Sequence, residues 1–213
     1  MDKLYEFLVG PALWAAFTLF VLGLVVRLAY FCGALSKERS GFLHSCADLK
    51  WVFGSIIGKL VAIKNVMSGS QPLWGIILFL FHACLLGVPL FLLAHNMLWE
   101  EAYSMSLPSL PDSVCDLLTV VFIAANAVLL AARIVRTELR RISTTWDYSL
   151  HFLTGVPFVA GFLAYHQIGP YRLILILHII FAEILLIIIP FSKPGHAIHT
   201  IVTGKLKQLQ SSY

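Results

Sequence analysis

Five long apolar segments, separated by polar stretches, run through the chain. They cover about residues 7–32, 72–98, 113–134, 148–166 and 171–190. A helix needs about 20 mainly apolar residues to cross the hydrocarbon core of a membrane, and each segment is close to that length. Because a membrane-spanning chain must satisfy its backbone hydrogen bonds internally, these segments predict five transmembrane helices. We therefore expect an all-α integral membrane protein, with one membrane domain over residues 1–213.

The stretch between the first two segments, residues 36–70, has a different pattern. Apolar residues recur between Leu49 and Met67, but Lys50, Lys59 and Lys64 interrupt them. Such a pattern favours an amphipathic helix that lies in the membrane interface or against a partner subunit, and it argues against a further span. We predict a cytoplasmic amphipathic loop here.

Composition and charge support the membrane class and set the orientation. The chain is 59% hydrophobic and 12% charged, whereas a soluble domain has about 25% charged residues. Thirteen of the 15 Lys and Arg lie after, or near the C-terminal end of, the first, third or fifth segment; Lys3 and Arg172 do not. We expect the chain to lie in the inner (cytoplasmic) membrane. The positive-inside rule then places its N-terminus outside and its C-terminus in the cytoplasm. The basic residues lack the interleaved aromatics of a nucleic-acid surface, so lipid is the expected surrounding and no nucleic-acid partner is expected.

Four histidines stand out, two near each of two spans. His82 and His95 lie 13 residues apart in the second segment, a rise of about 20 Å along one helix. His178 lies inside the fifth segment and His196 just past its end. An imidazole in hydrocarbon is costly without a partner, so such residues indicate function. Antiparallel packing would pair His95 with His178 near the outside, and His82 with His196 near the cytoplasm.

Two imidazole pairs at two depths predict two b-type haems in a four-helix-type bundle, with each iron held from opposite faces. Another pairing stays open, because His151 and His166 lie 15 residues apart in the segment 148–166. On spacing alone, His151 with His82 and His166 with His95 also make a workable pair at each depth. Arg27, near the inner end of the first span, is a candidate partner for a haem propionate or a simple interfacial anchor.

These residues resemble the cytochrome b (gamma) subunit of respiratory nitrate reductase, a family that includes the membrane cytochrome b subunits of heterodisulfide-reductase-like and sulfite-reduction complexes. The resemblance covers nearly the whole chain and rests most on His82, His95 and the run from His178 to its ending, Pro190-Phe191-Ser192-Lys193-Pro194-Gly195-His196. The stretch Ser143 to Asp147, which opens the fourth span, is similar too. The ending favours the fifth span over the fourth as the source of ligands.

The resemblance implies that His82 and His196 hold an inner haem, and that His95 and His178 hold an outer one. It also implies that a quinol, such as menaquinol, is oxidised near the outer haem and that electrons pass inward to a cytoplasmic iron–sulfur subunit. The chain would then be the quinone-oxidoreductase subunit of a respiratory complex. Two features depart from the nitrate reductase subunit: His82 and His95 are further apart with Pro89 between them, and the basic segment 36–70 differs. The second departure indicates another soluble partner, such as a heterodisulfide-reductase-like subunit.

Other functions remain open at the level of sequence. One is a haem-free membrane anchor, or a proton-relay or transport subunit, in which the histidines relay protons or bind a metal ion. A scaffold that only docks a cytoplasmic enzyme is another, although it leaves the paired histidines unexplained. Electron flow toward the quinone is as compatible with the sequence as flow away from it. The ionisable candidates near a quinone are Glu183, His166 and Tyr165, and Asn126 is the polar group we single out in the third span.

Overall fold

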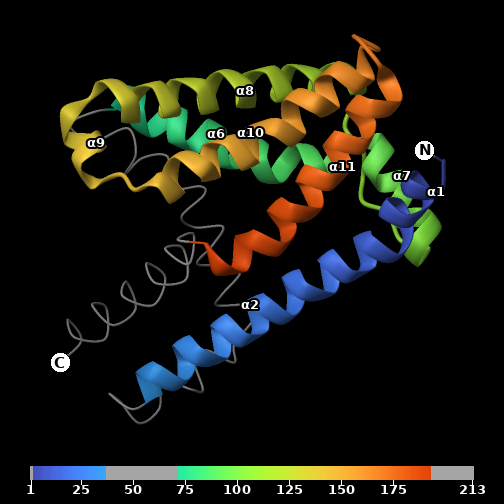
Figure 1. Cartoon of the computed structure of the whole chain (residues 1–213), viewed down its shortest axis with the longest axis horizontal. Helices are drawn as coiled ribbons and strands as arrows, with labels where there is room; N and C mark the ends of the chain where they lie inside the picture. Colours follow the sequence, from blue (N-terminus) through green and yellow to red (C-terminus); the bar gives the residue numbers. More distant parts are fainter. Residues whose placement is uncertain (1, 37–71, 193–213) are drawn as a thin grey trace. The chain divides into compact units, whose positions relative to one another are not determined.

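The computed structural model describes residues 2–36 and 72–192, and all regular structure in these two ranges is helical (Figure 1). The predicted loop 36–70, apart from Ser36, and the tail that carries His196 lie outside the described residues. The elements in chain order are α1 (Asp2–Phe7), η1 (Leu8–Ala12), α2 (Leu13–Ser36), α6 (Pro72–Phe91), α7 (Leu93–Tyr103), α8 (Asp112–Val135), α9 (Thr137–Ile142), α10 (Thr145–Tyr165), α11 (Tyr171–Ile188) and η2 (Ile189–Phe191).

Five helical stretches of the described chain are long and apolar enough to cross a membrane. They are Asp2–Arg27, Pro72–Phe91, Asp112–Val135, Thr145–Tyr165 and Tyr171–Phe191. Large apolar side chains on these helices face outward; Val26, Leu117 and Phe152 are 64%, 62% and 60% exposed. Apolar exposure on this scale is unfavourable in water and favourable in lipid. The prediction of a multi-pass, all-α membrane protein is therefore confirmed.

The second predicted span is not one helix. α6 ends at Phe91, Leu92 has extended backbone angles (φ −73°, ψ 129°), and α7 begins at Leu93. The prediction that a single helix over 72–98 carries both His82 and His95 is therefore wrong. Pro89 lies three residues before the break and weakens α6 there, because it lacks an N–H and its ring crowds the preceding turn. The break frees backbone carbonyls, and the Phe91 oxygen accepts a hydrogen bond of 2.9 Å from the Leu110 N–H.

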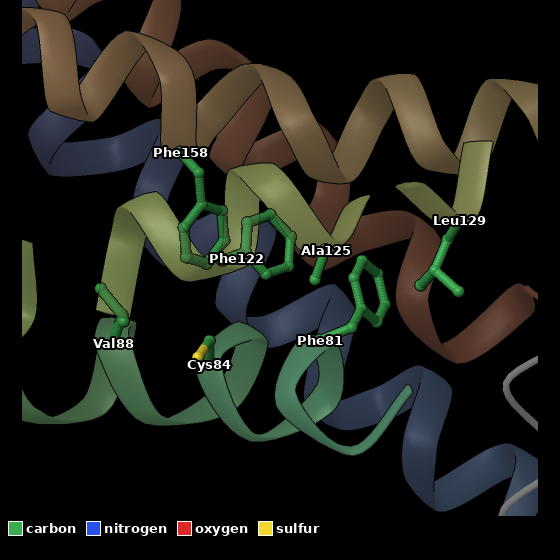
Figure 2. Close-up of a cluster of buried hydrophobic side chains, with 7 residues drawn as sticks. All are labelled: Phe81, Cys84, Val88, Phe122, Ala125, Leu129 and Phe158. Atoms are coloured by element: carbon green, nitrogen blue, oxygen red, sulfur yellow. The ribbon is translucent and has the colours of Figure 1, made fainter. Parts of the chain in front are cut away.

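The chain divides into two compact units that share α11. One unit runs from α6 to Phe181 in α11, and within it α8 packs against both α6 and α10 (Figure 1). Its core is a cluster of buried side chains at helical spacing. The cluster comprises Phe81, Cys84 and Val88 of α6, Phe122, Ala125 and Leu129 of α8, and Phe158 of α10 (Figure 2). The Phe122 ring, fully buried, stacks on Phe158 at 3.8 Å and on Phe81 at 5.0 Å between centroids.

The other unit contains α1, η1, α2 and the chain from Ala182 onward. Here α2 lies close to η2, because Gly23 has no side chain: a Cβ at this position would come within 2.7 Å of Pro190 Cβ. One turn further along α2, the Arg27 guanidinium donates to the backbone oxygens of Pro190 and Ser192, the latter at 2.8 Å. Arg27 therefore caps the end of the fifth span.

Candidate functional site

His95 and His178 lie next to each other, although α7 and α11 are far apart in the sequence. Their ring centroids are 6.0 Å apart and their ring planes differ by 23°. Both side chains are half-buried. The structure thus brings together the two histidines that the sequence analysis assigned to the outer pair.

Each ring of this pair is fixed by a hydrogen bond to a backbone carbonyl. His95 Nδ1 lies 3.0 Å from the Pro89 oxygen, and His178 Nδ1 lies 2.7 Å from the Pro157 oxygen. A carbonyl oxygen can only accept, so in both rings Nδ1 carries the proton. The neutral imidazole then keeps its lone pair on Nε2, the atom through which histidine commonly binds a metal.

Two residues of α10 shape the position of His178. Pro157 is buried in the middle of the helix and supplies the carbonyl oxygen for His178 Nδ1. One turn later, Gly161 leaves room for the imidazole: a Cβ there would lie 3.0 Å from both Cε1 and Nδ1 of His178. A proline and a glycine four residues apart on the same helix face therefore form the seat of this ring.

His82 has the same local arrangement as the outer pair. Its Nδ1 lies 2.7 Å from the oxygen of Leu78, one turn earlier on α6, so Nδ1 donates and Nε2 keeps the lone pair. The side chain is exposed in the described part of the chain. Its predicted partner His196 lies outside the described residues.

His151, the alternative ligand in the fourth span, uses both ring nitrogens. Arg133 Nε donates to His151 Nε2 at 3.1 Å, and His151 Nδ1 lies 2.7 Å from Asn126 Oδ1. Because a guanidinium can only donate, Nε2 accepts and Nδ1 donates to the Asn126 oxygen. The Arg133 guanidinium also donates to Ser143 Oγ at 3.0 Å. The lone pair that a metal would need is therefore already engaged in a polar network.

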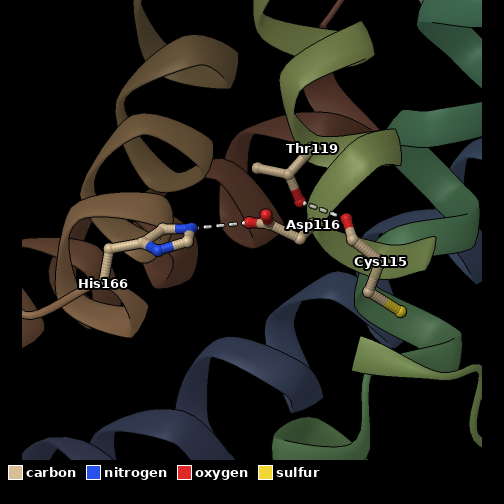
Figure 3. Close-up of polar contacts among 4 residues, drawn as sticks. All are labelled: Cys115, Asp116, Thr119 and His166. Atoms are coloured by element: carbon tan, nitrogen blue, oxygen red, sulfur yellow. Dashed lines mark hydrogen bonds and ion pairs between the residues drawn. The ribbon is translucent and has the colours of Figure 1, made fainter. Parts of the chain in front are cut away.

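His166, the second alternative ligand, pairs with a carboxylate. Its Nε2 lies 2.9 Å from Asp116 Oδ1, where α10 ends beside the first turns of α8 (Figure 3). Both side chains are about one-third exposed, at 35% and 32%. The sequence analysis missed Asp116, although a carboxylate inside an apolar segment is a signal that could have found it. Tyr165 contacts the His166 ring edge-on, at 5.1 Å between centroids.

Glu183 is buried within α11, at 8% exposure. Its Oε1 has no hydrogen-bond partner among the described residues. Arg27 belongs to the same unit, but its guanidinium binds the carbonyls of Pro190 and Ser192, about 10 Å further along the fifth span at helical rise. This carboxyl group therefore lies inside an apolar span without the ion pair that Arg27 could have provided.

Comparisons with known proteins identify a relative but no described family. No family model matches the chain, and no solved structure matches it. A protein of Nitratidesulfovibrio vulgaris (strain Hildenborough), described only as "Protein", is 36% identical over 198 residues. The match covers 92% of this chain and 88% of the relative. Identity and coverage of this extent show common descent over nearly the whole length, and the chain belongs to the same family as this Nitratidesulfovibrio vulgaris protein.

Proposed function

We propose that the chain is a b-type cytochrome subunit of a respiratory complex in the cytoplasmic membrane. It carries electrons between the quinone pool, such as menaquinone, and a cytoplasmic iron–sulfur subunit, for example one of heterodisulfide-reductase-like type. The observation that supports this proposal most is the pair His95 and His178, held near each other by separate helices. The chain itself would bind the haems and the quinone, and its soluble partner would perform the terminal reaction.

The outer pair fits a haem iron in spacing and in protonation. Metal–imidazole bonds of about 2 Å on both sides of an iron place the two ring centroids about 6 Å apart. The observed 6.0 Å agrees with that value. Both Nδ1 atoms donate to carbonyl oxygens, the arrangement that commonly orients metal-bound histidine. A haem b at this pair would supply one-electron transfer.

The inner pair, His82 and His196, is proposed from the hydrogen bond of His82 and from the resemblance. His82 has the Nδ1-to-carbonyl bond that His95 and His178 have, so its Nε2 is likewise left for a metal. His196 completes the pair in the resemblance to the nitrate reductase gamma family. His151 and His166 are less suitable, because the first accepts from Arg133 and the second is bound to Asp116.

The proposed orientation follows from the basic residues. Arg136, Arg140 and Arg141 lie between α8 and α10, while the short connections on either side of this hairpin are acidic or neutral. The positive-inside rule places this connection in the cytoplasm and the N-terminus outside. A cytoplasmic partner would then meet the α8–α10 connection.

A second candidate function is a haem-free proton-relay or transport subunit. The buried carboxyl group of Glu183 and the pair formed by His166 and Asp116 favour it, because ionisable groups at membrane depth mark proton pathways in such proteins. This candidate predicts no visible absorbance in the purified protein.

The deciding experiment is a dithionite-reduced minus oxidised spectrum of the purified chain, with a pyridine haemochrome count. We expect two haems b per chain in the wild type and the loss of one in His95→Ala and in His178→Ala. The control variant His166→Ala should keep two, because its histidine is bound to Asp116 at the surface. A wild-type protein without haem would contradict the proposal and leave the proton-relay function as the better account. Retention of both haems in His178→Ala would disprove the outer pair.

A further inference from the structure

A long apolar groove runs along α10, between α8 and the first half of α11. Its volume is about 400 Å³. It extends on α10 from His151 to Leu163 and is completed by Ile123, Asn126, Ala127 and Leu130 on α8 and by Ile174 and Leu177 on α11. Twelve residues of helix correspond to a length of about 18 Å. The groove is therefore long enough for an extended amphiphilic molecule that lies along the helices.

Only two of the side chains that line the groove are polar, and both lie toward the same end. Asn126 donates from Nδ2 to the backbone oxygen of His151 at 3.0 Å and accepts from His151 Nδ1 at 2.7 Å. A carboxamide has two hydrogens and two lone pairs on oxygen, so Asn126 keeps one donor and one acceptor. Asn126 is 8% exposed, and an occupant of the groove could satisfy the remaining donor and acceptor.

The depth of this polar end restricts what the groove can hold. His151 lies six residues after the start of α10 at Thr145, about 9 Å along the helix. A phospholipid keeps its charged headgroup at the interface, so its acyl chains would lie along the groove and leave the second N–H and the second lone pair of the Asn126 carboxamide unpaired. A quinone has an uncharged ring, with oxygens that accept when oxidised and donate when reduced, on an apolar isoprenoid tail.

We propose that this groove is a quinone site, with the quinone ring at Asn126 and His151 and the isoprenoid tail along Val159 and Leu163. Asn126 would donate to a quinone oxygen or accept from a quinol hydroxyl. The inference rests on the proposed function, which makes quinone a substrate, and it deepens that function by locating the substrate. The location differs from the outer one that the resemblance to the nitrate reductase family implies.

Ring contacts connect this end of the groove to the predicted inner haem ligand. The Phe81 ring lies 6.1 Å from the His151 ring and 5.1 Å from the His82 ring, between centroids. A quinone ring at His151 would therefore be separated from His82 by one phenylalanine. Electrons could pass between the quinone and the inner haem without crossing to the outer one.

The test is photolabelling of the full-length protein in lipid nanodiscs with an azido-naphthoquinone that carries a short isoprenoid tail. We expect labelled peptides from residues 123–130 or 151–163, and competition by unlabelled menaquinone but not by phosphatidylglycerol. Val159→Trp should fill the groove and reduce labelling about tenfold, which corresponds to about 1.4 kcal/mol of binding free energy. The matched control Val128→Trp should not change it, because Val128 is similarly exposed, at 45% against 41%, but does not line the groove.

Asn126→Leu should also weaken labelling, and the Val159→Trp variant keeps the test valid if Asn126→Leu fails to fold. Labelling confined to α7, equal labelling of Val159→Trp and wild type, or equal competition by phosphatidylglycerol would each overturn the site. A haem count on the same samples separates this inference from the proposed function. Two haems without groove labelling would overturn the inference alone, whereas groove labelling without haem would overturn the cytochrome proposal alone.

Discussion

Proton positions separate the histidines of the membrane helices into two groups. His82, His95 and His178 each donate from Nδ1 to a backbone carbonyl, and this leaves Nε2 as an acceptor. His151 and His166 use Nε2 in contacts with Arg133 and Asp116. The first group consists of three of the four ligands that the resemblance favours, and the second consists of the alternatives.

The spacing of histidines along the chain left two pairings open, and the resemblance to the nitrate reductase gamma family favoured the one in which His95 meets His178; neither indicated what holds the two rings. By depth alone, His95 could be paired with His178 or with His166. The Pro157 carbonyl and the space above Gly161 come from α10, a different helix, and depend on how α10 and α11 are rotated against each other. Apolar periodicity does not determine that rotation to the accuracy of a hydrogen bond.

Gly161→Ala tests whether the position of the His178 ring against Pro157 and Gly161 is needed for haem binding. The added Cβ would come within 3.0 Å of the imidazole, so the ring must shift and its bond to the Pro157 oxygen must weaken. We expect a partial loss of one haem, or an altered absorption band of the haem that remains, measured in reduced-minus-oxidised spectra. Gly87→Ala is the matched control, because a Cβ at Gly87 meets nothing within 4 Å. Equal spectra of the two variants would contradict the role of the seat.

Among the elements, the break between α6 and α7 is the main departure from the sequence analysis. The apolar pattern continues through 72–98, and a proline inside an apolar span commonly kinks a helix without ending it. Here the Leu110 N–H, from the segment that follows α7, donates a hydrogen bond of 2.9 Å to the Phe91 carbonyl oxygen that the break leaves free. This distant partner cannot be read from the local pattern. The third, fourth and fifth predicted spans agree with the apolar helices within three residues at each end, whereas the first differs by five residues at both ends.

Gly23→Ala tests the contact between α2 and η2. The new Cβ would come within 2.7 Å of Pro190 Cβ and would force α2 away, together with the Arg27 hydrogen bonds to Pro190 and Ser192. We expect a loss of about 1–3 kcal/mol of stability, seen as a lower midpoint of thermal unfolding by circular dichroism in detergent. Gly10→Ala, where a Cβ meets nothing within 4 Å, should unfold like the wild type. An unchanged midpoint for Gly23→Ala would show that α2 and η2 can move apart at this contact without a loss of stability.

On the scale of the whole molecule, composition and hydrophobic length were sufficient to predict a membrane protein with five spans. The pattern succeeds here because only helices and closed barrels satisfy their backbone inside lipid, so apolar length translates directly into spans. The proposed haems, quinone and partner subunit depend instead on side-chain chemistry at a few positions, which hydrophobic length does not report.

The orientation of the spans can be tested with alkaline phosphatase fusions, which are active only outside the cytoplasm. We expect activity for fusions after Leu107 and after Ile168, and none for a fusion after Glu138. The physical reason is the cluster of arginines around α9, which the positive-inside rule holds in the cytoplasm. The opposite pattern would invert the proposed topology and place the soluble partner on the other side.

The helix break at Leu92 has a consequence for energetics as well as for shape. Because α6 ends at Phe91, the Pro89 carbonyl oxygen is left to accept a hydrogen bond from Nδ1–H of His95. A hydrogen bond at Nδ1 increases the electron density of an imidazole, and a more electron-rich ligand favours ferric over ferrous iron. Pro89→Ala should strengthen the helix around this break, weaken the bond to His95 and raise the midpoint potential of the outer haem in a redox titration, while the inner haem stays unchanged. If the potential does not rise, the bond has no such influence. Through this bond, one proline would help to set the driving force for electron transfer across the membrane.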